Sequence, residues 1–236
     1  MKIHYITQTN SKNISIDLYE ADAYHQAGQA VAISLGNQQK HLPAVHFLIC
    51  LNPCKNEATK CIPSEGKNYT LTLEGGRLIQ SLPLCLAEAK NPLFCVDRAD
   101  NRCALEADMS NLLAGSLAEA KYNAAKKGKV LAKNSTVFSM LRLYSSSSAN
   151  IEPVYDYLES CFSSPVDRQR KLNELFQASL NFINDSAIWE QIEALATYIL
   201  AQSKAIIDCE EINFFLASWQ KSTYLKENEN ELIACN

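Results

Sequence analysis

The sequence predicts an α+β protein that is predominantly α-helical, with a small N-terminal strand-helix-strand portion packed on a C-terminal helical bundle. Short apolar or alternating stretches that suit strands are confined to the first third of the chain. From about Ile79 onward, the apolar residues recur at helical spacing instead. A chain of 236 residues can bury a sizeable core, and its length fits one domain or two small ones.

Two portions of the chain follow from this change of pattern. Residues 1–144 are expected to form the N-terminal portion and residues 145–236 the C-terminal helical portion. A run of four serines, residues 145–148, is the candidate hinge between them. We expect the two portions to fold as one cooperative unit, because an amphipathic helix at about 21–35 would otherwise lack a surface to pack on.

Strands and one helix are expected in the N-terminal portion. Alternating or compact apolar composition predicts strands at residues 1–9, 14–16, 45–51 and 69–73. Ala27, Val31 and Leu35 share one side of the helix predicted over 21–35. The pair Gly36-Asn37 supplies a stop signal for this helix. Residues 40–103 separate this helix from the next long one.

Helices are expected over most of the remaining chain. A helix at about 105–127 carries Gly115 near its middle. Glycine costs about 1 kcal/mol there relative to alanine, so another backbone is expected to pack closely against it. Four further helices are predicted at about 151–162, 166–184, 186–203 and 208–221. Pro165, Asp185 and Asp208 are their start signals.

Two aromatic pairs of the C-terminal portion are interpreted first as core residues. Trp189 and Trp219 lie on apolar stripes of their predicted helices. Phe214 and Phe215 on the last helix are assigned to the core as well, with a surface for a partner as the alternative.

Composition and charge argue against several classes of function. The net charge is −4, and no run of basic residues provides the electrostatic footprint of a nucleic-acid-binding protein. The densest basic cluster is interpreted as a solvated helix end; it comprises Lys126, Lys127, Lys129 and Lys133. No stretch approaches the ~20 apolar residues that cross a bilayer. The N-terminus lacks the features of a signal peptide, so we expect a cytoplasmic protein, or one exported by a route without a conventional signal peptide.

Nine cysteines occur in the chain, and an odd number without a secretion signal favours reduced thiols. Cys50, Cys54 and Cys61 form the one cluster that could be weighed as a metal site, with Cys85 or His46 as a fourth ligand. Their spacing misses the usual C-x₂-C knuckle of zinc sites. Ordinary buried thiols are the preferred interpretation.

The stretch Tyr24-His25-Gln26-Ala27-Gly28-Gln29-Ala30-Val31-Ala32 carries the most specific functional signal. In the zincin pattern H-E-x-x-H, two histidines on one helix face hold Zn²⁺, and the glutamate is the general base. Here His25 occupies the first ligand position, Gln26 the base position and Gln29 the second ligand position. An amide cannot accept the proton from a metal-bound water, and it is a poor zinc ligand.

These residues resemble the His-Glu-Ala-Gly-His-Ala-Val signature of FtsH-type zinc peptidases. A later segment, Leu112-Leu113-Ala114-Gly115-Ser116-Leu117-Ala118-Glu119-Ala120, is similar to the Leu-Gly-Gly-Arg-Ala-Ala-Glu-Glu helix of that family. The family's third ligand, an aspartate in Ser-Asn-Asp-Ile, corresponds to Asn150 in Ser148-Ala149-Asn150-Ile151. No G-x-x-x-x-G-K-[ST] loop occurs, so the family's ATPase domain is missing, and stand-alone relatives of the peptidase domain are the closer comparison.

The resemblance implies a zincin-like fold with degenerate metal and base positions. We therefore expect a catalytically inactive peptidase-like protein, a pseudo-peptidase, that binds a protein or peptide partner. No cofactor is expected, and zinc is expected only if this interpretation is wrong. Glu119 matches a family glutamate that the resemblance implies is structural, with a general base as the alternative role. A carboxylate in a helix–helix contact usually accepts from backbone or Arg donors.

Two enzymatic alternatives remain open. One is an active metallopeptidase with shifted ligands, in which His25 is joined by Asp156 or Asp167, or by His41 or His46. The other is a thiol enzyme that uses Cys50 with His46, because a strand over 45–51 would place both side chains on one face.

Overall fold

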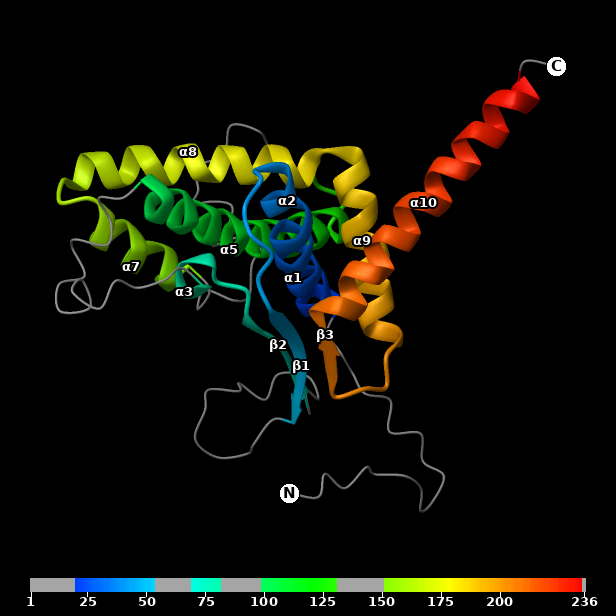
Figure 1. The fold of residues 1–236 in the computed structure, drawn as a ribbon, viewed down its shortest axis with the longest axis horizontal. Coiled ribbons are helices and arrows are strands. Elements are labelled where there is room, and N and C mark those ends of the chain that lie inside the picture. The colour runs from blue at the N-terminus through cyan, green and yellow to red at the C-terminus, as the bar shows by residue number, and fades with distance from the viewer. Residues whose placement is uncertain (1–19, 54–68, 82–98, 131–150, 235–236) are drawn as a thin grey trace.

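A computed structural model of the chain describes residues 20–53, 69–81, 99–130 and 151–234. Helices predominate in this part of the chain and accompany a small antiparallel sheet, which confirms the predicted α+β class with predominance of helices (Figure 1). The strands predicted at 1–9 and 14–16, and the hinge at 145–148, lie outside the described residues. None of the described helices combines the length and apolar composition needed to cross a membrane.

The sheet has three strands in the order β2-β1-β3. Strand β1 (Phe47–Pro53) pairs antiparallel with β2 (Tyr69–Gly75), and Ile49 lies opposite Leu73. On its other side, β1 pairs antiparallel with β3 (Ile206–Asp208). The sequence did not predict β3, and this short strand joins residues of the C-terminal portion to the N-terminal sheet.

Helices α1 (Glu20–Val31) and α5 (Ala99–Lys126) cross at the centre of the molecule (Figure 1). Small residues permit a close crossing: a Cβ added to Gly28 would lie 2.5 Å from the Cβ of Ala118. A Cβ added to Gly115 would lie 2.9 Å from the carbonyl oxygen of His25. The expectation that another backbone packs against Gly115 is therefore confirmed, and that backbone belongs to the motif helix. Helix α5 begins at Ala99, earlier than predicted.

The motif helix does not stop at Gly36-Asn37 as predicted. It continues from α1 through a π-helical turn, η1 (Ala32–Gly36), and ends in α2 (Asn37–Gln39). Gly36 has right-handed helical torsions (φ −65°, ψ −38°), so it does not terminate the helix. The backbone N–H of Asn37 instead donates to the carbonyl of Ala32, five residues back, which is the bond of a π-turn. The left-handed residue that follows is His41, with φ of 56°.

The remaining helices are α3 (Leu78–Ser81), α7 (Glu152–Cys161), α8 (Pro165–Asn184), α9 (Ser186–Ala201) and α10 (Cys209–Ala234). The predicted start signals are confirmed. The Asp185 carboxylate accepts from the N–H of Ile188 at 3.1 Å, and the Asp208 carboxylate accepts from the N–H of Glu211 at 2.8 Å. Helix α10 extends beyond the predicted end at 221 and projects away from the other helices toward the C-terminus (Figure 1).

The core lies between α1, α5, α8 and α9, where Ile192, Leu195 and Leu117 are fully buried. Trp189 is partly buried and stacks on Tyr24 of α1, with ring centroids 5.7 Å apart. The assignment of Phe214 to the core is wrong, because 75% of this residue is exposed. Ile212 and Leu216 point inward from the same helix, and a residue two positions from each of them must lie on another face.

Candidate functional site

His25 of α1 lies against α5 and is almost completely buried. Its Nδ1 is 3.0 Å from Oε2 of Glu119, and the two side chains are 2% and 0% exposed. An ionised carboxylate can only accept, so the hydrogen bond forms in this way when Nδ1 carries the ring proton. For a structural Glu119, backbone or Arg donors were the expected partners. The partner is the motif histidine, 94 residues earlier in the chain.

The two segments that carry the resemblance therefore lie side by side. The second nitrogen of the His25 ring, Nε2, faces the backbone of α5, since a Cβ at Gly115 would lie 3.2 Å from it. The same added Cβ would lie 3.1 Å from Cβ of Gln29. His25 and Gln29, the two ligand positions of the pattern, thus share the face of α1 that packs on Gly115.

Gln26, at the position that the general base has in the H-E-x-x-H pattern, makes a hydrogen bond to the edge strand β2 of the sheet. The backbone N–H of Leu51 donates to the carbonyl of Ala205, on the β3 side of the sheet, at 2.8 Å. Leu51 and its partner Leu71 on β2 are therefore a non-hydrogen-bonded pair, and the backbone N–H and C=O of Leu71 point away from β1. The Gln26 amide nitrogen donates to this outward carbonyl of Leu71 at 3.1 Å, in a buried contact. The residue that would activate water in a zincin therefore makes a hydrogen bond to the backbone here.

The other proposed ligands are not brought to His25. Asn150 lies outside the described residues. Asp156 is exposed on α7, and Asp167 in the first turn of α8 pairs with Arg170 at 2.7 Å. His41 and His46 are both exposed. In the part of the chain that the structure describes, no three His, Cys, Asp or Glu side chains gather as a metal site.

The residues around His25 do not fit a bound zinc ion. A structural zinc site uses four imidazole, thiolate or carboxylate ligands, and a catalytic site uses three with an open position for water. His25 is one imidazole, Gln29 offers an amide, and the Glu119 carboxylate is hydrogen-bonded to the far side of the imidazole ring.

The geometry of Cys50 and His46 does not suit a thiol enzyme. Cys50 is buried within β1, whereas His46 is exposed and immediately precedes the strand. Four residues of extended chain span about 13 Å, so a shared face does not bring the two side chains into contact. Burial raises the pKa of the Cys50 thiol, and the nearby Glu74 carboxylate adds to this effect. A nucleophilic cysteine needs the opposite shift. Of the possible metal cluster around Cys50, Cys54, Cys61 and Cys85 lie outside the described residues.

Two hydrogen bonds of the buried Asp108 side chain on α5 were not predicted. The Asp108 carboxylate accepts from the N–H groups of Leu78 and Ile79, at 2.7 and 3.1 Å, and so caps the start of α3. Burial raises the pKa of Asp108, although both backbone hydrogen bonds and the Arg77 charge oppose the shift.

A cleft with a volume of about 440 Å³ lies between the segment Ile33–Phe47 and the first turns of α10; we name it the α2–α10 cleft. Its lining is largely apolar and includes Leu35, Leu42 and Leu216. Amide and hydroxyl side chains supply the rest of the lining, and none of the described lining residues is charged.

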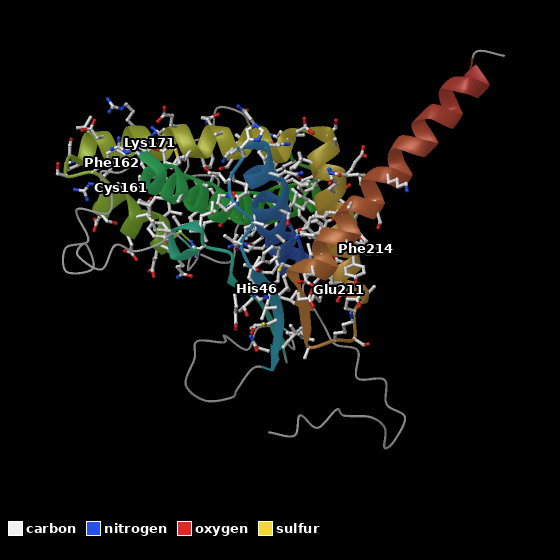
Figure 2. The ribbon with its side chains drawn as sticks, viewed as in Figure 1. His46, Cys161, Phe162, Lys171, Glu211 and Phe214 are labelled. Carbon is white, nitrogen blue, oxygen red and sulfur yellow. The ribbon has the colours of Figure 1, made fainter. Side chains whose placement is uncertain are left out.

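Figure 2 shows Phe214 on the outside of α10 and His46 near the start of β1, far from Cys161 and Phe162 at the other end of the molecule.

Comparisons with known proteins give no relative from which a function can be transferred. No family model matches the chain, no curated protein matches it, and no solved structure matches it.

Proposed function

We propose that the chain is a pseudo-peptidase: a protein with a zincin-like fold, related to FtsH-type peptidase domains, that acts by binding a protein or peptide and not by hydrolysis. The observation that carries this proposal is the hydrogen bond between Nδ1 of His25 and Glu119. Zinc-binding histidines generally use their second ring nitrogen in this way, with a carboxylate or carbonyl that orients the ring.

The contact has the form of the outer shell of a zinc site whose other parts have been replaced. The carboxylate that orients His25 is present, whereas the second ligand and the base are Gln29 and Gln26. Loss of the base alone would stop turnover, because the amide of Gln26 cannot take a proton from water and donates to Leu71 instead. Binding of a partner is the activity that such a fold retains, and the α2–α10 cleft offers a concave surface for it.

Metal content and hydrolysis together test this proposal. The protein is purified without added metal and dialysed, its zinc content is measured by elemental analysis, and its activity on a quenched fluorescent peptide library is followed with and without added zinc. We expect substoichiometric zinc and no hydrolysis in either condition. Stoichiometric zinc with chelator-sensitive hydrolysis would overturn the proposal in favour of shifted ligands. Hydrolysis abolished by Cys50→Ser would overturn it in favour of a thiol enzyme.

A further inference from the structure

A smaller pocket, with a volume of about 140 Å³, lies between the π-turn η1, α5 and α8; we name it the π-turn pocket. Ala32 and Gly36, the first and last residues of η1, line it on one side. Ala114 of α5 and Ala178 and Phe182 of α8 line it on the others. An apolar cavity of about 150 Å³ can hold a benzene molecule, so this pocket has room for a small ligand with an apolar part of that size.

The hydroxyl groups in the lining of the π-turn pocket already donate within the protein. Oγ of Ser110 donates to the carbonyl of Glu106 at 2.8 Å, and Oγ of Ser179 donates to the carbonyl of Ser110 at 3.2 Å. A hydroxyl has one proton to donate, so neither serine has a second one for a ligand. The exposed donors in the lining are the ammonium group of Lys40 and the side-chain amide of Gln39.

Lys40 has no counterion of its own in the part of the chain that the structure describes. It forms no ion pair and no side-chain hydrogen bond with any of the described residues. Burial lowers the pKa of Lys40, and the Glu106 carboxylate on α5 opposes this shift. That carboxylate is itself paired with Lys171 at 3.1 Å. An anion bound in the pocket would therefore supply the opposite charge that the Lys40 ammonium group lacks.

We propose that the π-turn pocket binds a small monocarboxylate whose apolar part is about the size of a benzene ring. The Lys40 ammonium group pairs with the carboxylate, and the Gln39 amide donates to it. The apolar part packs on Ala114 and Phe182. A phosphate would meet a single cation and mostly apolar walls, and a hydrocarbon would leave Lys40 without a counterion. This inference goes beyond the proposed function, because it assigns a small-molecule ligand to a pocket other than the α2–α10 cleft.

The test uses the full chain at neutral pH with three small probes. Benzoate has both a carboxylate and a ring, benzamide has the ring with a neutral group of similar shape, and acetate has the carboxylate without the ring. Dissociation constants are measured by ligand-observed NMR for the wild type and Lys40→Met, with Lys129→Met as the control at an exposed lysine outside the pocket. A second pair, Ala178→Leu and Gln177→Leu, adds the same side chain at exposed positions of α8, of which only Ala178 lines the pocket.

We expect the wild type to bind benzoate about tenfold or more tightly than it binds benzamide or acetate. Lys40→Met and Ala178→Leu should each weaken benzoate binding about tenfold, and the two control variants should bind it like the wild type. Benzamide binding as tight as that of benzoate would overturn the carboxylate class, and equally tight acetate binding would overturn the apolar part of the ligand. Unchanged benzoate binding in either Lys40→Met or Ala178→Leu would overturn the assignment to this pocket. No binding of benzoate to the wild type would overturn the inference altogether.

Discussion

At the scale of single residues, the most consequential contact is the buried hydrogen bond between His25 of α1 and Glu119 of α5. His25 and Glu119 satisfy each other in a place that excludes water. Removing one member of such a pair leaves the other buried without its partner, which costs far more than the loss of a pair in water.

Glu119→Ala should therefore lower the free energy of unfolding by about 3–5 kcal/mol. Glu159→Ala is the matched control, because Glu159 pairs with Arg168 while it is 67% exposed, and it should cost at most about 1 kcal/mol. Urea denaturation of both variants measures the difference. A loss for Glu119→Ala as small as that of the control would mean that His25 does not depend on this carboxylate.

The free energy of unfolding should depend on pH through Asp108 in the direction opposite to that of an ion-paired carboxylate, whose pKa is lowered on folding. Burial raises its pKa in the folded protein, so the folded state binds a proton more tightly than the unfolded chain. As pH rises from about 4 through the raised pKa, this residue's contribution to the free energy of unfolding falls.

The variant Asp108→Asn lacks this titration but keeps one side-chain acceptor for the N–H groups of Leu78 and Ile79. We expect the stability of the variant relative to the wild type to improve as pH increases from about 4 to about 7. Urea unfolding of both proteins across that range measures the difference. A constant difference would show that the Asp108 pKa is the same in the folded and unfolded states.

At the scale of elements, the crossing of α1 and α5 depends on small residues. A close backbone contact at Gly115 was predictable, because glycine within a helix indicated it. The contribution of Gly28 on the other side of the crossing was not predicted. The π-turn was not predictable from its residues, since Gly36 matched a stop signal that the surrounding packing overrides. Strand β3 was missed because three residues carry no periodic pattern, and their conformation comes from pairing with residues 48–50, far away in the sequence.

Gly28→Ala should destabilise the protein by about 1–3 kcal/mol, although alanine is the better helix former. The added Cβ would lie 2.5 Å from Cβ of Ala118 and 3.0 Å from the carbonyl oxygen of Ala114, so one helix must shift. Gly36→Ala is the control, because its Cβ would make only ordinary contacts at 3.7 Å with the ring of Phe182. We expect the control to be neutral or slightly stabilising in thermal unfolding. Equal effects of the two substitutions would show that the crossing has room for a side chain.

At the scale of the whole molecule, the sequence predicted which helices meet but not how their polar groups pair. The resemblance placed His25 and Glu119 in two segments of one family pattern, yet the hydrogen bond between them depends on the tertiary packing of α1 on α5. The contact of Gln26 with Leu71 depends in the same way on the register of β1, β2 and β3. The uncharged cleft involves residues from both portions of the chain, so no local pattern could indicate it.

The central claim, that the amides occupy a dismantled zinc site, is tested most directly by restoring the site. Zinc is measured by elemental analysis after dialysis in the wild type and in the variant Gln26→Glu/Gln29→His/Asn150→Asp. A control variant, Gln26→Glu/Gln38→His/Asn150→Asp, carries the added histidine at exposed Gln38 instead. We expect about one zinc per chain in the restored variant and none in the wild type or the control. Stoichiometric zinc in the wild type, or a folded restored variant that binds none, would contradict the claim.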